Sequence, residues 1–165
     1  MIRFTQPTDC EMLLDIDIKC YDKVWLANEF LATDTYVYII DKRIVAFVSW
    51  RTNGGTLQII KLGVTPAFRR QGIGSTMIDA VLCRGLITRC LVSEDWLSAQ
   101  LFLKDNQFKW VNTTIKRNTA LYTMENKNGI DNLAGSYFDE CFGVDGPDVD
   151  RHGPSDGPEA AGIYT

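Results

Sequence analysis

The chain has 165 residues, 45% of them hydrophobic and 23% charged, which suffices for the buried core of one ordinary globular domain. No apolar run reaches the roughly 18 residues that a membrane span needs, and the start lacks the apolar centre of a secretory signal. The five cysteines are scattered, and the only histidine is His152. These features argue against a membrane protein, a disulfide framework and a His-based catalytic or metal site, and they favour a reducing compartment.

The net charge of −4 conceals two oppositely charged parts. Residues 130–165 hold eight acidic residues and one basic residue and carry −7, while the rest of the chain carries +3. The mildly basic part suits a small anionic ligand better than a nucleic acid, which usually binds a denser patch of Lys and Arg. We therefore do not expect nucleic-acid binding.

The first half of the chain, taken in order, begins with a predicted strand over residues 2–4 and a helix over residues 9–21. The expected inner face of this helix is Met12, Leu13, Ile16 and Cys20. A second helix is predicted over residues 24–31. Strands over residues 35–40, 44–51 and 56–64 follow, and Asn53-Gly54-Gly55 is typical of the hairpin turn between the last two.

The second half begins with a helix predicted over residues 74–84, with Met77, Ile78, Val81 and Leu82 facing inward. A strand over residues 88–92, a helix over residues 97–104 and a hairpin over residues 108–116 and 119–125 complete the predicted domain, residues 1–125. Residues 126–165 are predicted to form an acidic tail rich in Gly, Pro and Asp. Its composition is typical of disorder, although Tyr137, Phe138 and Phe142 could dock onto a partner.

The segment that points to chemistry covers residues 62–75. It comprises a strand end, a loop with Arg69 and Arg70, and a turn with Gly72 and Gly74 that opens a helix. Such a turn exposes backbone N–H groups at a helix N-terminus, where they and the helix dipole bind phosphate oxygens. A dinucleotide-binding loop needs a third glycine and a Walker loop needs a Gly-Lys-Ser/Thr step, and neither is present.

This segment resembles the GNAT family of N-acetyltransferases. The run Arg69-Arg70-Gln71-Gly72-Ile73-Gly74 fits the family's Arg/Gln-x-x-Gly-x-Gly/Ala signature and follows the strand end Leu62-Gly63-Val64-Thr65-Pro66. Downstream, Trp96-Leu97-Ser98-Ala99-Gln100-Leu101-Phe102-Leu103 followed by Phe108 is similar to the family's Asn-x-x-Ala-x-x-Phe-Tyr…Gly-Phe segment. The resemblance covers about residues 1–125. It implies an α/β (α+β) GNAT fold, in which a mixed, mostly antiparallel sheet of six or seven strands is flanked by about four helices and splayed at strands 4/5.

The resemblance also implies acetyl-CoA as co-substrate, with no metal. The pyrophosphate would rest on the backbone of residues 70–75 with Arg69 nearby, and the pantetheine would pair like an extra strand with the backbone of Leu62 and Val64. The amine would approach from the other side, over the first two helices. The implied cofactor-binding residues are Leu62, Gly63, Val64, Arg69, Arg70, Gln71, Gly72, Ile73, Gly74, Ser75 and Ser98.

Three departures from the family pattern fall on the catalytic side. The family's glutamate base corresponds to Gln58, its tyrosine acid to Leu103, and the asparagine that orients the acyl group to Trp96. Neither Gln58 nor Leu103 can exchange a proton near pH 7.

The substitutes that the sequence offers are Glu94 and Asp95, just beyond the fifth predicted strand, as bases, and Tyr36 and Tyr38 as proton donors. Glu94 and Asp95 also have a purely structural interpretation, because acidic residues commonly cap the helix that follows.

Three hypotheses follow. The first is an acetyl-CoA-dependent N-acetyltransferase that acts on a primary amine of a small molecule or a protein. The second is a catalytically degenerate GNAT-like domain with a structural or binding role, for example a virion-associated phage protein, whose residues 130–165 contact a protein partner. The third is a tail that folds over the CoA cleft by charge attraction, which salt would weaken. The acceptor amine, a homo-oligomeric state, and a cytoplasmic or virion-associated location stay open.

Overall fold

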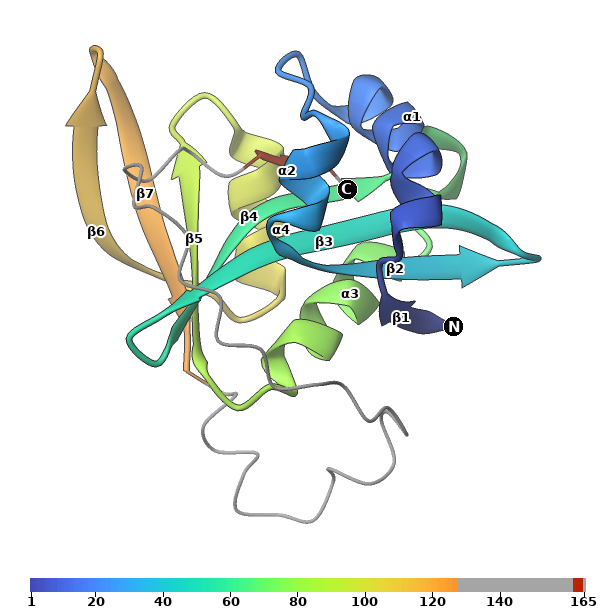
Figure 1. The fold of residues 1–165 in the computed structure, drawn as a ribbon. Helices are drawn as coiled ribbons and strands as arrows, with labels where there is room; N and C mark the ends of the chain where they lie inside the picture. Colours follow the sequence, from blue (N-terminus) through green and yellow to red (C-terminus); the bar gives the residue numbers. More distant parts are fainter. Residues whose placement is uncertain (128–161, 165) are drawn as a thin grey trace.

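The computed structural model describes residues 1–127 and 162–164, and its centre is a mixed sheet in the order β1-β2-β3-β4-β5-β7-β6, with β8 pairing to β4 (Figure 1). The strands are β1 (Ile2–Phe4), β2 (Asp34–Ile40), β3 (Arg43–Asn53), β4 (Thr56–Val64), β5 (Ile87–Ser93), β6 (Lys109–Lys116), β7 (Thr119–Asn126) and β8 (Gly162–Tyr164). The helices are α1 (Cys10–Cys20), α2 (Ala27–Leu31), α3 (Ile73–Leu82) and α4 (Leu97–Asp105), with single 3-10 turns η1 (Pro7–Asp9) and η2 (Pro66–Phe68).

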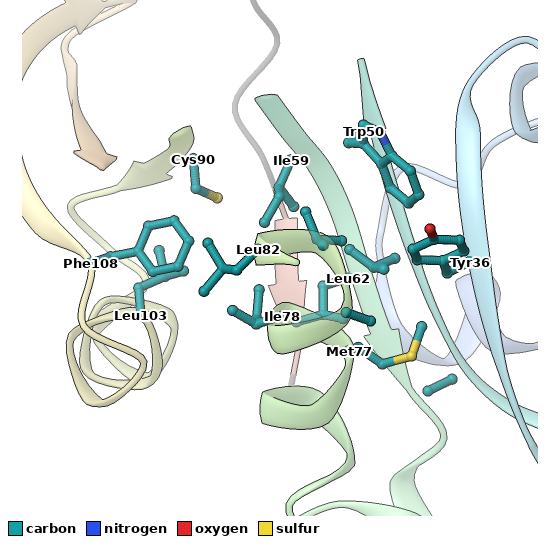
Figure 2. Close-up of a cluster of buried hydrophobic side chains, with 14 of the residues drawn as sticks. Tyr36, Trp50, Ile59, Leu62, Met77, Ile78, Leu82, Cys90, Leu103 and Phe108 are labelled. Carbon is teal, nitrogen blue, oxygen red and sulfur yellow. The ribbon is translucent and has the colours of Figure 1, made fainter. Parts of the chain in front are cut away.

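Helices cover both faces of the sheet, so the molecule has two apolar layers. On one face, Ile16 of α1 and Phe30 of α2 pack with Phe47 of β3. On the opposite face, Ile78 of α3 packs with Leu62 of β4, and α4 completes the same cluster (Figures 1 and 2). The four predicted inner residues of α3 are all buried, as their helical spacing requires.

The splay that the sequence analysis expects lies between β4 and β5. These two strands pair in parallel only over Thr56–Ile59 and Ile87–Cys90, whereas β3 stays paired with β4 up to Val64. The edge of β4 that faces β5 is therefore released from β5 over residues 60–64, and we call this stretch the gap edge. The mixed sheet, the four helices and this splay confirm the predicted fold class.

Two predictions about the first helices are wrong in detail. Met12 is 43% exposed, and Asp17, which is not among the predicted inner residues, is fully buried. The reason is that Asp17 binds Lys61 of β4, an interaction between residues far apart in the sequence. The second helix begins at Ala27 rather than near residue 24.

Within residues 126–165, whose composition is typical of disorder, Gly162–Tyr164 form the strand β8. Asn126 is the last residue of β7, and the predicted division into residues 1–125 and 126–165 stays a prediction. The cluster of Tyr137, Phe138 and Phe142 lies outside the described residues. Within the part of the chain that the structure describes, no helix combines the length and apolar character that a bilayer span requires. The same part holds no group of three or more metal-binding side chains.

Candidate functional site

The loop between β4 and α3 forms a cavity of about 170 Å³. Its lining residues are Val64, Phe68, Arg69, Arg70, Gly72, Ile73, Gly74, Ser75 and Phe102. Most of them belong to the set implied for the cofactor. The lining contains two arginines and no carboxylate, so the cavity suits an anionic group.

The backbone at the start of α3 explains the glycine in this loop. Gly72 is the N-cap of α3, its φ is +80°, and no side chain caps the helix. A Cβ at Gly72 would meet nothing within 4 Å, so the left-handed backbone rather than crowding requires glycine there. Because α3 begins at Ile73, the N–H groups of its first turn lack partners inside the helix and can bind an anion.

The two arginines have different roles. Arg69 is half-buried and fixed to the end of β4, since its Nε donates to the carbonyl of Val64 at 2.9 Å and its Nη2 donates to Cys20 Sγ at 3.4 Å. Burial raises the pKa of the Cys20 thiol, which keeps its proton near neutral pH. Arg70 is exposed at the cavity, and its φ of +60° is unusual for a residue with a side chain.

Alternation along β4 decides which backbone groups face the gap. The N–H of Thr65 donates to the carbonyl of Val45, on the β3 side. Because successive residues of a strand direct their backbone groups to opposite edges, the N–H and C=O groups of Leu62 and Val64 belong to the gap edge. These are the two residues whose backbone the family resemblance assigned to the pantetheine.

Tyr21, directly after α1, contacts the gap edge and was missed by the sequence analysis. Its hydroxyl accepts from the Leu62 N–H at 3.0 Å and donates to the Leu62 carbonyl at 2.8 Å. Burial raises the pKa of Tyr21 well above its ordinary value. The hydroxyl is therefore protonated at neutral pH and able to donate.

An ion pair fixes the segment that carries Tyr21. Lys61 Nζ lies 2.8 and 2.9 Å from the two carboxylate oxygens of Asp17 and 2.9 Å from the carbonyl of Lys23. The N–H of Trp25 donates to Asp17 Oδ2 at 2.6 Å, and the ammonium lies 4.4 Å from the Tyr21 ring centroid. Burial lowers the pKa of Lys61. A lysine within the apolar run of β4 is the signal that could have indicated this pair.

Four of the implied cofactor residues lie outside the cavity lining: Leu62, whose backbone belongs to the gap edge, and Gly63, Gln71 and Ser98. Gly63 is a packing glycine, because a Cβ there would come within 2.8 Å of Phe47 Cε1. The side chain of Gln71 is exposed and donates to the carbonyl of Ala67 at 3.2 Å. Ser98 is exposed in the first turn of α4.

The suggested bases lie at the end of β5. Glu94 exchanges two hydrogen bonds with the backbone of Ala120, one of them through its carboxylate at 2.8 Å. Ala120 belongs to β7, which occupies the edge of β5 opposite to β4, so this bond holds the carboxylate on the side away from the gap. Asp95 is exposed, and its N–H donates to Ser93 Oγ at 3.4 Å. A catalytic role for either residue stays a prediction.

Two residues that depart from the family pattern, and one suggested substitute, lie in strand pairings or in the core. Gln58 lies between Arg51 of β3 and Arg89 of β5. Leu103 is fully buried in the core between α4 and the sheet. The suggested donor Tyr36 is also buried, in an aromatic cluster, and its hydroxyl accepts from Arg84 at 3.3 Å.

A larger hollow of about 390 Å³ lies between α4 and the hairpin of β6 and β7. Its lining is mostly apolar, from Leu97, Leu101, Trp110 and Met124, with Lys104 as the one cation among the lining residues. It lacks the arginine pair and the positive-φ glycine turn found at the β4–α3 loop, so we place the candidate site at that loop.

Comparison with known proteins identifies the kind of domain that carries this loop. The sequence model of the acetyltransferase (GNAT) domain matches residues 32–112, which include the whole β4–α3 segment. A search of curated proteins finds no significant match. The match to the acetyltransferase domain over about half of the chain, together with the fold, is consistent with a divergent member of the GNAT family of acetyltransferases.

Solved structures share the fold at low sequence identity. The ribosomal-protein-S18-alanine N-acetyltransferase from Escherichia coli is 14% identical, with 76% of this chain and 91% of that chain covered and a TM-score of 0.68. Ard1 from Thermoplasma volcanium is 24% identical, with 76% and 95% covered and a TM-score of 0.66. Naa50 from Arabidopsis thaliana, in complex with the bisubstrate analogue CoA-Ac-MVNAL, is 17% identical, with 76% and 97% covered and a TM-score of 0.65.

Proposed function

We propose that the protein transfers the acetyl group of acetyl-CoA to a primary amine of a small molecule or a protein. The observation that carries this proposal is the cavity at the start of α3, where free first-turn N–H groups and Arg70 surround a space without carboxylates. A pyrophosphate fits these donors, because a helix N-terminus and a guanidinium both favour negative charge. Gly72 keeps the approach open, since no atom lies within 4 Å of its Cβ direction.

The gap edge continues from this cavity, because Val64 belongs to both. An extended ligand anchored at α3 would run along Leu62, whose N–H can hold a carbonyl oxygen in place of the Tyr21 hydroxyl. When bound, acetyl-CoA supplies a thioester whose carbonyl carbon accepts the amine. The Tyr21 hydroxyl lies beside this position, and we propose that it donates a hydrogen bond and then a proton to the departing thiolate.

The amine must also lose a proton, and several groups could accept it. Gln58 cannot accept a proton, so the acceptor must reach the site as a neutral amine or pass its proton to Glu94, Asp95 or solvent. Positioning still contributes most of the rate in such a mechanism, because two reactants held in contact avoid the entropy cost of encounter. We therefore expect Glu94→Gln and Asp95→Asn to change the pH dependence of the rate if either residue is the base.

The first test is isothermal titration of acetyl-CoA into the full-length protein and into Gly72→Glu. A carboxylate at Gly72 would repel the pyrophosphate, so micromolar binding should be lost. Gly55→Glu is the matched control, because Gly55 is also exposed, has a φ of +76° and has no atom within 4 Å of its Cβ direction, but lies in the β3–β4 turn. Equal binding by both variants would contradict the proposed site.

The second test addresses the acid. Tyr21→Phe keeps the ring against Lys61 and removes only the hydroxyl, so the rate of thiol release should fall at least tenfold while acetyl-CoA affinity changes little. Tyr38→Phe, on β2, removes a hydroxyl that the sequence suggested as a donor. If Tyr38→Phe reduced the rate and Tyr21→Phe did not, the assignment of Tyr21 would be wrong.

A non-catalytic role is the second candidate, and the burial of Leu103 at the family's acid position favours it. In that case acetyl-CoA binds but no free thiol appears with any amine of a broad panel. We propose that residues 130–165 then provide contacts to a protein partner through their acidic side chains. Replacement of Asp145, Asp148 and Asp150 by Asn in the full chain should weaken such a complex.

A further inference from the structure

The C-terminal strand β8 lies against the strand that leads to the candidate site. Gly162–Tyr164 pair in parallel with Lys61–Gly63 of β4, and β8 also contacts β5 and α4. Figure 1 shows it as the dark red strand beside β4, close to the marked C-terminus. A three-residue strand from the far end of the chain thus enters the central sheet.

The edge that β8 occupies follows from the pairing of β4. Over Lys61–Gly63 one edge of β4 is taken by Phe47–Ser49 of β3. The pairing of β4 with β5 ends at Ile59. β8 can therefore pair only along the gap edge, between the splayed strands.

The same edge is the path from the cavity at α3. Tyr164 pairs with Gly63, the residue before Val64, and Val64 lines the cavity. A ligand anchored at the start of α3 and extended along β4 would meet β8 within one residue of the cavity. β8 and such a ligand would occupy the same place along Lys61–Gly63 of β4, so both cannot pair there at once.

We propose that the gap edge is a docking site for an extended peptide, that its occupant is this chain's own β8, and that acyl-CoA must displace β8 to bind. The docking stands on the strand pairing alone, whereas the competition rests on the proposed function. Backbone pairing to a free sheet edge is a general mode of peptide recognition. Here the peptide is covalently attached, so docking needs no second molecule.

The test uses the full chain with Ile163→Pro and, separately, Tyr164→Pro. Neighbouring residues of a strand direct their N–H groups to opposite sides, so one of the two prolines removes a donor to β4. Ala160→Pro, outside the paired residues, is the control for proline itself. The first readout is amide hydrogen exchange at Val64, with the Gly63 amide, which faces β3, as an internal reference; the Leu62 amide is not used, because it donates to the Tyr21 hydroxyl.

We expect at least one of the two variants to accelerate exchange at Val64 severalfold or more, without a change at Gly63 or in Ala160→Pro. The second readout is the dissociation constant of acetyl-CoA. If β8 is docked about nine-tenths of the time, its release should tighten acetyl-CoA binding about tenfold. This gain should persist in high salt, because backbone pairing involves no net charge, whereas attraction of the acidic tail would be screened.

The outcomes separate the two proposals. Exchange that is unchanged in both variants overturns the docking of β8, whatever happens to acetyl-CoA. Faster exchange without a change in acetyl-CoA affinity supports docking and overturns competition. Faster exchange in a protein that never binds acetyl-CoA supports docking and overturns the proposed function instead.

Discussion

Removal of the buried ammonium by Lys61→Met should destabilise the protein strongly. Asp17 is fully buried, and without Lys61 its carboxylate keeps only the N–H of Trp25 among the bonds described above. An unpaired buried charge costs about 3–5 kcal/mol, against a total stability of about 5–15 kcal/mol for an ordinary domain. With a urea slope of about 2 kcal/mol/M, the midpoint of unfolding by circular dichroism should fall by about 2 M.

A matched control comes from the exposed pair of Lys19 and Asp15 on α1, which are 45% and 64% exposed. Lys19→Met should cost less than about 1 kcal/mol, because solvent screens an exposed pair. The double variant Asp17→Leu with Lys61→Met should recover much of the loss, since an apolar pair replaces the charges. A loss below about 1 kcal/mol for Lys61→Met, or a double variant no more stable than the single one, would refute the reasoning.

Three further predictions concern the β4–α3 segment and the N-terminus. Gly63→Ala should lower the free energy of unfolding in urea by about 1–3 kcal/mol, because its Cβ would lie 2.8 Å from Phe47 Cε1. Its affinity for acetyl-CoA should be retained. A loss of binding without a loss of stability would restore a cofactor role for Gly63. Gly72→Ala should cost about 1–2 kcal/mol by the same assay, through the left-handed backbone alone, and a neutral effect would contradict the φ of +80°. The hydrogen bond from Arg3 lowers the pKa of Asp9 below 3.8 in the folded protein. The ionised Asp9 carboxylate therefore stabilises the fold above pH 3.8, and this stabilisation is lost as the pH falls through the lower folded pKa. Asp9→Asn should reduce stability at pH 7 and flatten the acid limb of a stability–pH curve, and an unchanged limb would exclude Asp9 as a contributor.

The parts of the fold that the sequence predicts well rest on local signals. β4 was predicted over residues 56–64 and is found there, because β-branched and apolar residues end at a glycine turn on one side and at Pro66 on the other. The turn at Gly54 and Gly55 has positive φ at both residues, as an Asn-Gly-Gly step favours. The loop into α3 was predicted from the same kind of local chemistry.

The parts that the sequence did not predict depend on partners far away in the chain. Asp17 and Tyr21 reach Lys61 and Leu62 across more than 40 residues, and no local pattern of α1 indicates a buried carboxylate. β8 is a comparable case, because Gly162–Tyr164 follow a segment rich in Gly and Pro and become a strand only beside β4. A strand of three residues needs an existing edge, and only the tertiary structure supplies one.

The splay of the sheet leaves backbone groups of the gap edge unpaired by β5, and residues distant in the sequence bond them. Separation of β4 from β5 leaves backbone donors and acceptors at Leu62 and Val64 without a strand partner, and such an edge invites pairing with other chains. Tyr21 bonds both groups of Leu62, Arg69 bonds the carbonyl of Val64, and β8 runs along the same edge. Because a bound ligand must exchange its own hydrogen bonds for these, its net gain at the edge is small, and most of its affinity has to come from the anion cavity at α3. This argument explains why we expect a substitution at Gly72 to abolish binding, whereas a substitution in β8 should only adjust it.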